Sequence, residues 1–340
     1  MASDRVVPVA VIGMGRIGRI HAANVLRSTK LALVAVASRT QASADKAAAE
    51  LGSGVAAVGV DQALDDPAVE AVIIANQTVG HVEYATRALN HGKHVLLEKP
   101  GAISLTEHCR LRKCAAQTDR IVATGYLRRY DKTFQELKAR VRSGAIGTPS
   151  LVNLVAREYE IPDSDVLSAI GFIADVAVHD FDIAAWILGQ EPLEVYATTQ
   201  QAKHAALPFD SAVVVVRFDG GGIATLHLSC NSPGADDVRC EVVGADGSIA
   251  ITGLAEGHRS LDLVDRHSTR GAPKDYAARF GLALQAELDA FADRCRGRQQ
   301  DGPDLVSDAR ALAIAVAARA SVAAGKPLEV GPDWPWHGPM

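Results

Sequence analysis

Short apolar runs alternate with alanine-rich amphipathic stretches over the first third of the chain. Runs such as Val6–Ile12 and Leu31–Ala37 are rich in β-branched residues, which is typical of strands buried on both faces of a parallel sheet. The stretches between the runs carry apolar residues at helical spacing, and Ser104 followed by Glu107 forms a capping box. We expect strands at Val6–Ile12, Leu31–Ala37, Val55–Val58, Ala71–Ala75, His94–Leu97 and Ile121–Gly125, and helices at Arg16–Ser28, Ala42–Leu51, Val79–His91 and Ser104–Thr118. The pattern predicts a doubly wound α/β domain over residues 1–126.

The pattern changes after Gly147, where longer strands follow one another and are joined by turns such as Asp246-Gly247. We expect strands at Leu151–Arg157, Leu193–Thr199, Ala212–Phe218, Ile223–Ser229, Val238–Val243 and Ser248–Ile251, and helices at Asp131–Ser143, Ser168–Leu188, Ala277–Arg296 and Leu305–Ala324. Residues 127–340 are therefore predicted to form a C-terminal α+β domain with a large, mainly antiparallel sheet. One face of that sheet would stay apolar and uncovered, which predicts a homodimer or homotetramer.

Composition narrows the classes of protein. A chain of 340 residues with 48% hydrophobic side chains suits two domains. The 35 basic and 40 acidic side chains give a net charge of -5, so nucleic acid is not an expected partner. No apolar run reaches the roughly 20 residues of a membrane span, and we see no export signal. Five cysteines without metal-ligand spacing suit thiols in the cytoplasm, so neither a disulfide framework nor a zinc site is expected.

A glycine-rich turn lies between the first strand and the first helix, at Gly13-Met14-Gly15-Arg16-Ile17-Gly18. Gly13 permits the tight turn, Gly15 lets a pyrophosphate approach the backbone, and Gly18 lets helix and strand pack closely. The N–H groups at Arg16 and Ile17 would face the anion at the helix N-terminus. This context predicts a Rossmann dinucleotide-binding domain, although a glycine-rich turn without a ligand remains the alternative.

The end of the second strand indicates which dinucleotide binds. An NAD enzyme usually has an acidic residue here for the ribose hydroxyls, whereas this chain has Ser38, Arg39 and Thr40. A hydroxyl and a guanidinium suit a 2′-phosphate better. We therefore predict NADP(H) as the preferred cofactor, with NAD(H) possible. Arg39 could instead stack on adenine or point to solvent.

Three motifs in order carry a resemblance to a known family. They are the glycine turn, the segment Glu98-Lys99-Pro100 after the fifth strand, and the run from Asp175 to Asp182, which reads DVAVHDFD. Together they resemble the glucose-fructose oxidoreductase / inositol dehydrogenase / rhizopine catabolism family (Gfo/Idh/MocA). The segment Tyr126–Asp131, YLRRYD, is similar to the corresponding segment of the inositol 2-dehydrogenase branch.

The resemblance implies roles for residues of this chain. Lys99, Asp175 and His179 would be catalytic: His179 takes the hydroxyl proton as hydride leaves for the nicotinamide, Asp175 orients the imidazole, and Lys99 donates to the reacting oxygen. A core histidine satisfied by its own helix is the alternative for His179, and Asp182 is expected to support this helix through hydrogen bonds. Cofactor contacts are further expected from Asn76, Gln77, His81, Glu98 and Lys99, although His81 also suits a purely structural place at a helix start. Substrate contacts are expected from Lys99, Tyr126, Arg128, Asp163, Asp175, Val176, His179 and Asp236.

Two positions depart from the inositol dehydrogenase pattern. Val176 stands where those relatives tend to have Thr, and Asp236 where they tend to have Tyr. The segment Glu158–Asp165 adds further carboxylates, Glu158, Glu160, Asp163 and Asp165. A solvated acidic loop is one interpretation, and a pocket for a substrate that carries an amine is the other.

These observations predict an NAD(P)-dependent dehydrogenase that interconverts a secondary alcohol and a ketone on a cyclitol, aminocyclitol or sugar. A pyranose dehydrogenase or keto-sugar reductase of the same family is the first alternative. A ligand sensor without catalysis is the alternative from another class, and the presence of Lys99, Asp175 and His179 argues against it. No metal is expected, because no second histidine or carboxylate cluster accompanies His179 in the sequence.

Overall fold

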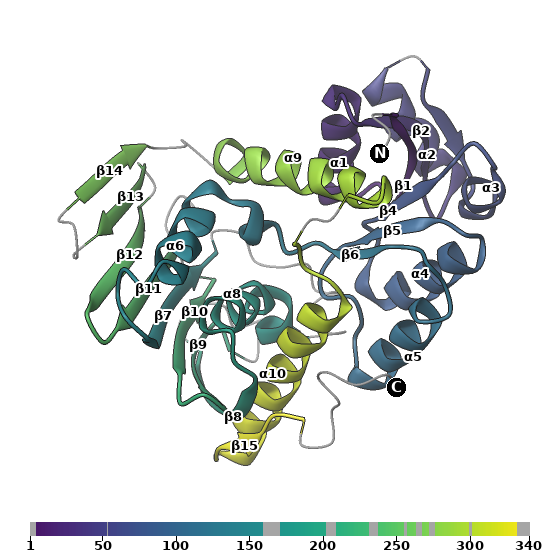
Figure 1. Ribbon diagram of the computed structural model, residues 1–340. Helices are drawn as coiled ribbons and strands as arrows, with labels where there is room; N and C mark the ends of the chain where they lie inside the picture. Colours follow the sequence, from purple (N-terminus) through teal and green to yellow (C-terminus); the bar gives the residue numbers. More distant parts are fainter. Residues whose placement is uncertain are drawn as a thin grey trace. The chain divides into compact units, whose positions relative to one another are not determined.

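The computed structural model describes residues 5–52, 54–158, 171–201, 209–230, 237–254, 257–262, 267–271, 276–298 and 301–331. The chain divides into two compact units, residues 1–127 with 284–308 and residues 128–283 with 309–340. Figure 1 labels the elements of both units. The first unit thus takes in residues 284–308, which the sequence pattern had assigned to the second domain.

The first unit is a Rossmann-like domain around a six-stranded parallel sheet in the order β3-β2-β1-β4-β5-β6, which confirms the predicted fold of this part. Its strands are β1 (Val7–Ile12), β2 (Leu31–Ala37), β3 (Ala56–Val58), β4 (Ala71–Ile74), β5 (His94–Leu97) and β6 (Val122–Thr124). Its helices are α1 (Arg16–Arg27), α2 (Gln41–Leu51), α3 (Val60–Asp65), α4 (His81–Asn90), α5 (Leu105–Ala115) and the C-terminal part of α9 (Tyr276–Cys295). Helix α3 was not predicted, because six residues are too few to show a helical period.

Both faces of this sheet are covered by apolar side chains. Val9 and Val11 of β1 belong to one core cluster, and Ala10 and Ile12 to the cluster on the other face. The first cluster is completed by Phe291 of α9, which packs with α1 and β1 although it lies far away in sequence. Since both faces are buried, the strands have the continuous apolar character that the sequence showed.

The second unit is built on a nine-stranded sheet in the order β14-β13-β12-β11-β7-β10-β9-β8-β15. Its strands are β7 (Pro149–Arg157), β8 (Pro192–Gln200), β9 (Ser211–Phe218), β10 (Ile223–Ser229), β11 (Asp237–Gly244), β12 (Gly247–Leu254), β13 (Gly257–Asp262), β14 (His267–Gly271) and β15 (Leu328–Glu329). Among the described strand pairs of this nine-stranded sheet, only β7 and β10 run parallel. The prediction of a mainly antiparallel sheet is therefore confirmed. Strands β13 to β15 were not predicted, because they lack a clear apolar alternation.

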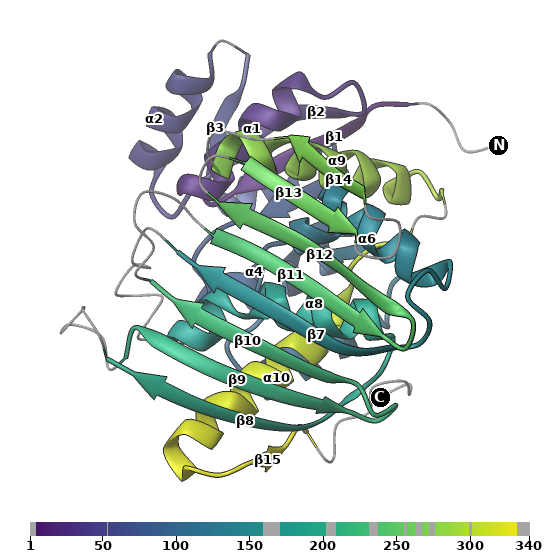
Figure 2. The ribbon, with the colours of Figure 1, turned by 90° about the vertical axis from the view of Figure 1, so that its left-hand side faces the viewer.

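Helices cover one face of this sheet. Figure 2 looks onto the opposite face, with α8 (Val178–Leu188) and α10 (Leu305–Ala324) behind the strands. Along β9 buried residues alternate with exposed ones, as expected for a sheet with one covered face. The remaining helices that begin in this unit include α6 (Lys132–Arg142), whose N-terminus Asp131 caps by accepting from the N–H groups of Thr133 and Phe134.

The predicted helix Ser168–Leu188 is interrupted within its described part. Residues 171–176 are helical, Ala177 is a turn, and α8 begins at Val178. Asp175 and His179 therefore lie on two successive helical segments rather than on one continuous helix, which corrects the prediction. Burial still distinguishes these two residues, which are four apart in the sequence. Between residues 172 and 182, only Asp175 and His179 are not buried.

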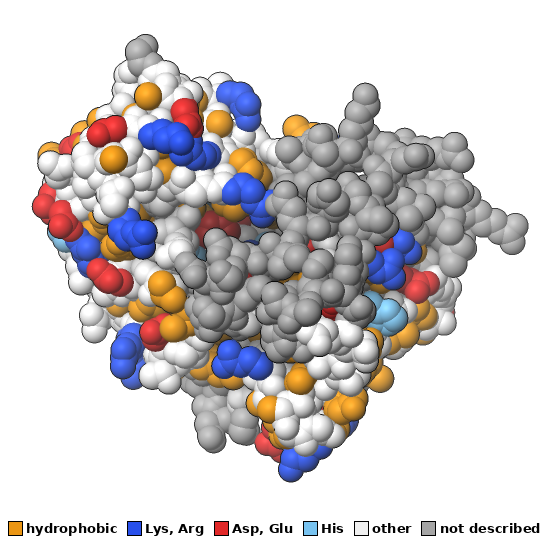
Figure 3. All heavy atoms as spheres, turned by 180° about the vertical axis from the view of Figure 1, so that it is seen from behind, with side chains coloured by type: hydrophobic (Ala, Val, Ile, Leu, Met, Phe, Trp, Pro, Cys, Tyr) orange, Lys and Arg blue, Asp and Glu red, His pale blue; other side chains and the backbone are white. Residues whose placement is uncertain are grey.

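The described helices include none that is long and apolar enough to cross a membrane. On the face drawn in Figure 3, Lys and Arg side chains lie interspersed with Asp and Glu side chains over the described surface. Neither sign of charge forms a continuous patch there.

Candidate functional site

The glycine turn has the geometry that a dinucleotide needs. Gly13 has φ +96°, and a Cβ at this position would collide with the backbone of Asn76. A Cβ on Gly18 would collide with the carbonyl oxygen of Gly13, so the close packing of α1 on β1 requires glycine here. A Cβ on Gly15, by contrast, would meet nothing within 4 Å. The turn is thus crowded beneath and open at Gly15, where a pyrophosphate would approach.

The N-terminus of α1 leaves its N–H groups to a ligand. Its cap residue, Gly15, offers no side-chain acceptor, and no acidic residue lies in the first turn. Arg16 is exposed and Ile17 is half-buried, so this end of the helix faces outward. A phosphate group fits this position because it accepts from backbone N–H groups and is favoured by the helix dipole.

The three residues after β2 differ in what they can offer a cofactor. The Thr40 hydroxyl accepts from Ser43 N at 3.3 Å and caps α2, and the Ser38 hydroxyl lies 3.2 Å from that of Ser43. Arg39 is exposed. Thr40 is exposed as well, but both hydroxyls of the predicted trio already take part in local hydrogen bonds, whereas Arg39 offers an exposed guanidinium.

His81, the first residue of α4, contacts the backbone next to Lys99. His81 is 1% exposed, and its two ring nitrogens lie 2.8 Å from the carbonyl oxygen of Pro100 and 3.0 Å from that of Asn76. Burial lowers the pKa of the His81 imidazole below its ordinary value, although the contacts with the two carbonyl groups act to raise it. Both nitrogens thus face backbone carbonyl groups inside the protein, and the cofactor contact expected from His81 stays a prediction. Gln77 is exposed and Asn76 half-buried.

Glu98 follows β5 and turns toward α1. Its Oε1 lies 2.7 Å from Nε2 of His21, and its Oε2 accepts from Lys99 N at 3.2 Å. Burial acts to raise the pKa of Glu98, but the hydrogen bond to His21 and the charges of His21 and Lys99 outweigh it and hold this pKa below its ordinary value. The carboxylate, predicted to contact the cofactor, is engaged by His21 and by the backbone of Lys99.

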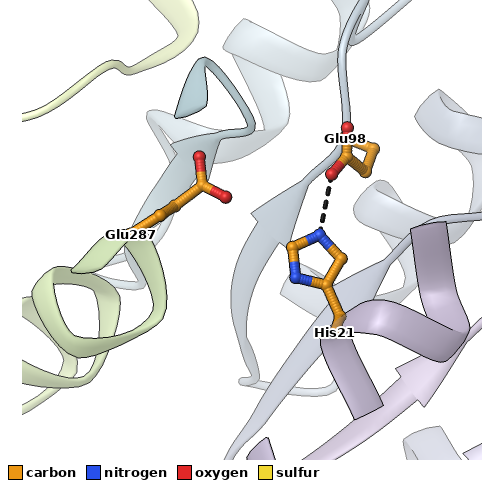
Figure 4. A group of neighbouring side chains, drawn as sticks. All are labelled: His21, Glu98 and Glu287. Carbon is orange, nitrogen blue, oxygen red and sulfur yellow. Dashed lines mark hydrogen bonds and ion pairs between the residues drawn. The ribbon is translucent and has the colours of Figure 1, made fainter. Parts of the chain in front are cut away.

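Glu287 of α9 points toward the same pair (Figure 4). The side chain is 1% exposed, and its burial, followed by the charge of Glu98, raises its pKa well above the ordinary value. His21, Glu98 and Glu287 each offer one ligand atom within 4.8 Å of the others. They form the group of side chains in the described part of the chain that could hold a metal ion.

Asp308 anchors the loop that follows Lys99. Its carboxylate accepts from Gly101 N, from the Tyr126 hydroxyl at 2.7 Å, and faces His108 Nε2 at 3.0 Å. Burial acts to raise the pKa of Asp308, but the hydrogen bond and charge of His108, with the bonds from Tyr126 and Gly101, hold it below its ordinary value. Tyr126 is 1% exposed and its hydroxyl is bonded to Asp308, and the substrate contact expected from it stays a prediction.

The residues of the DVAVHDFD run, around the start of α8, differ in their burial and their partners. Asp175 and His179 are half-buried. Val176 is 2% exposed and belongs to the core, and the substrate contact expected from it stays a prediction. Asp182 and Asp180 are buried and form ion pairs.

Two arginines of the YLRRYD segment provide those ion pairs. Arg128 donates to Asp180 at 2.6 Å, and Arg129 donates to both oxygens of Asp182 at 2.7 and 2.5 Å. Asp182 was expected to support its helix through hydrogen bonds, and Arg129 is the residue that donates to it. Arg128 is 6% exposed and its guanidinium donates to Asp180, and the substrate contact expected from it stays a prediction.

Asp163 and Asp236, predicted to contact substrate, lie outside the described residues, as do Glu160 and Asp165 of the acidic segment. Glu158 is described, and its N–H donates to the carbonyl of Ser229 at 2.8 Å. The interpretation of the acidic segment thus stays a prediction.

The family models match both parts of the chain. The model described as "Oxidoreductase family, NAD-binding Rossmann fold" matches residues 7–126, and the model described as "GFO/IDH/MocA C-terminal domain" matches residues 134–250. The chain belongs to the GFO/IDH/MocA oxidoreductase family. The resemblance found in the sequence is thereby confirmed, and the protein is an oxidoreductase whose Rossmann domain serves a nicotinamide cofactor.

Relatives within the GFO/IDH/MocA family are similar over nearly their whole length. The chain is 31% identical to a scyllo-inositol 2-dehydrogenase (NAD(+)) of Bacillus subtilis, covering 94% of this chain and 95% of the relative. It is 30% identical to a myo-inositol 2-dehydrogenase of Thermotoga maritima, covering 92% and 96%. A crystal structure of a myo-inositol dehydrogenase from Corynebacterium glutamicum superposes with a TM-score of 0.85 at 26% identity, covering 96% of this chain and 100% of that one.

Sequence reasoning missed four residues around Glu98 and the loop after Lys99. His21 and His108 lie on helices without a local motif, and Glu287 and Asp308 come from the distant segment 284–308. Charged or polar residues at buried helix positions were the available signal. Only the fold shows which partners they meet.

Proposed function

We propose that this member of the GFO/IDH/MocA family oxidises a secondary alcohol of a cyclitol to the ketone, and reverses the reaction, with a nicotinamide cofactor. The observation that carries the proposal is the state of Asp175 and His179: within residues 172–182 they alone are not buried, while Asp180 and Asp182 are committed to arginines. An acid and a histidine four residues apart, both partly exposed, suit a general base and the group that orients it.

In the proposed reaction each residue has one task. His179 accepts the proton of the substrate hydroxyl, Asp175 orients the imidazole, and the Lys99 ammonium donates a hydrogen bond to the same oxygen as it becomes a carbonyl. The bound cofactor supplies the acceptor for the hydride that leaves the adjacent carbon. Lys99 is half-buried, and its backbone is fixed from both sides, by Glu98 before it and through Pro100 and Gly101 after it.

We further propose that NADP(H) is the preferred cofactor. Arg39 is exposed directly after β2, and residues 38–40 contain no carboxylate that would repel a 2′-phosphate. The Bacillus relative is named for NAD(+). We attribute a difference from that relative in cofactor preference to Arg39.

A panel of substrates tests the reaction and its specificity. Purified protein with NADP⁺ or NAD⁺ is offered myo-inositol, scyllo-inositol, scyllo-inosamine, glucose and galactose, and reduced cofactor is measured. The proposal expects higher kcat/KM for the cyclitols than for the pyranoses. A preference for a pyranose would favour the sugar dehydrogenase instead, and binding without any turnover on the whole panel would favour a sensor.

The inosamine in that panel tests the acidic segment. If a carboxylate of Glu158–Asp165, or Asp236, reaches the substrate, an ammonium group on the ring gains a charge-assisted hydrogen bond of about 1.5–3 kcal/mol. That free energy corresponds to a roughly ten- to hundredfold higher kcat/KM for scyllo-inosamine than for scyllo-inositol. Equal values at pH 7 would mean that the segment is solvated surface.

We also propose that the second unit mediates self-association, into a homodimer or homotetramer. The uncovered face of its sheet carries Tyr196, Val213 and Ile223, which are 38%, 40% and 39% exposed. Packing this face against a second copy would remove the apolar side chains from water. Light scattering that gave the mass of one chain, 35.8 kDa, at micromolar concentration would contradict this. The cytoplasm is the proposed location, because the five cysteines, all described, form no disulfide.

A further inference from the structure

Three titratable side chains from three separate elements meet inside the first unit. His21 comes from α1, Glu98 from the end of β5 and Glu287 from α9, and one potential ligand atom of each lies within 4.8 Å of the other two. Figure 4 shows the Glu287 carboxylate directed toward the pair formed by His21 and Glu98. The proposed catalytic roles use none of these three side chains.

The group contains buried polar atoms that lack a hydrogen-bond partner. Within the described residues, both oxygens of Glu287 and Nδ1 of His21 have no hydrogen-bond partner. Glu287 is 1% exposed and His21 is 0% exposed. Buried polar atoms are nearly always satisfied by protein, water or a ligand. Two unmet carboxylate oxygens beside a second carboxylate are groups that a bound cation would satisfy.

We propose that His21, Glu98 and Glu287 form a binding site for one divalent transition-metal cation, with Zn²⁺ as the expected ion. The two carboxylates would balance the charge of such an ion, and imidazole with carboxylate is a donor set that zinc uses. Zinc also binds nitrogen and oxygen donors more tightly than most divalent first-row ions do. The inference does not depend on the proposed reaction.

The hydrogen bond already present orients the ring for this task. His21 Nε2 faces Glu98 Oε1 at 2.7 Å, so the ion would take the place of the proton between these two atoms and would also be ligated by Glu287. Donors around a four-coordinate zinc lie about 3.3 Å apart, so binding would move these two atoms slightly apart and draw Glu287 closer. Glu287 can supply this movement, because no hydrogen bond within the described residues holds its carboxylate.

A cation here would tie together parts of the first unit that are distant in sequence. It would join α1 and the end of β5 to α9, in addition to the apolar packing of Phe291. Since Glu98 also accepts from the N–H of Lys99, the ion would fix the strand end that precedes Lys99. We therefore expect metal to stabilise the folded protein.

The test measures metal content and stability, not activity. Tag-free full-length protein is stripped with EDTA, incubated with ZnSO₄, dialysed against metal-free buffer and analysed by inductively coupled plasma mass spectrometry. We expect about one Zn²⁺ per chain in the natural protein, and at least a tenfold lower content in Glu287→Gln and in His21→Gln. Added Zn²⁺ should raise the thermal unfolding midpoint of the natural protein by about 5 °C and leave that of Glu287→Gln unchanged.

Two matched variants show whether the zinc is bound at this place. Glu83→Gln removes an exposed carboxylate of α4 and should keep the zinc. Cys109→Ser with Cys114→Ser removes the half-buried thiols and should keep it as well. The proposal is overturned if the natural protein retains no zinc, or if Glu287→Gln retains as much as the natural protein. In either case Glu287 would be a buried acid that stays protonated, and Glu287→Gln would fold with unchanged stability in EDTA.

Discussion

Both carboxylate oxygens of Asp308 accept from the backbone N–H of Gly101, at 3.1 and 3.0 Å. Asp308 lies in the first turn of α10, and Gly101 is the second residue after Lys99. A Cβ at Gly101 would collide with the same carboxylate, so glycine is required for this approach. The loop after Lys99 is thus fixed by a buried charge more than 200 residues away.

Asp308→Asn should disturb this loop. The amide would place an N–H group against a donor, Gly101 N or the Tyr126 hydroxyl, and we expect a loss of on the order of 2–3 kcal/mol in the free energy of unfolding. If Lys99 acts as proposed, kcat should fall at least tenfold, while the dissociation constant of the cofactor changes little. Chemical denaturation and steady-state kinetics measure the two effects. Asp304→Asn is the control: Asp304 caps α10, Asn caps equally well, and neither quantity should move.

Stability should depend on pH through His81. Burial lowers the pKa of His81 in the folded protein below the 6.5 of the unfolded chain. Below pH 6.5 the unfolded state therefore binds one proton more, so the free energy of unfolding falls as the pH falls, by up to about 1.4 kcal/mol per pH unit from this group. Denaturation from pH 7.5 to 5 should show a shallower slope for His81→Gln than for the natural protein. Burial also lowers the pKa of His94, which contributes to the slope equally in the natural protein and in His81→Gln.

For comparison, Lys46→Gln replaces an exposed side chain of α2 whose residue type titrates far above this pH range, and should leave the slope unchanged. Parallel stability curves for the natural protein and His81→Gln would show that the proton uptake comes from elsewhere.

Arg39→Ala should change cofactor preference. The guanidinium can pair with the 2′-phosphate of NADPH but finds no such group on NADH, and a charge-assisted contact contributes about 1.5–3 kcal/mol. We expect KM for NADPH to rise about ten- to a hundredfold and KM for NADH to change less than threefold. Lys46→Ala, which removes another exposed cation from α2, should affect neither. An equal change for both cofactors would argue against the proposed NADP(H) preference.

His179→Ala should remove catalysis and spare cofactor binding. General base catalysis contributes about 10²–10⁴-fold, and the glycine turn that holds the pyrophosphate belongs to the other unit. We expect kcat to fall by that factor and the dissociation constant of the cofactor, measured by fluorescence titration, to stay within twofold. His91→Ala, at an exposed site, serves as control. Turnover near that of the natural protein would exclude His179 as the base.

The sequence by itself determined those features that depend on neighbours along the chain. The period of apolar residues specified β1, β2 and most helices, because one or both faces of each element must be buried. The glycine turn specified its own geometry, since Gly13 and Gly18 are required by sterics within a few residues. The order of three short motifs identified the family.

The tertiary structure decided which polar groups are engaged. The sequence predicted substrate contacts from Tyr126, Arg128 and Val176. The fold buries all three side chains and pairs the first two with Asp308 and Asp180. Such pairs join residues from distant parts of the chain, so no local pattern reports them. A buried charge requires a partner wherever the fold can bring one, and that requirement placed Asp308 against Gly101 and Glu287 beside His21 and Glu98.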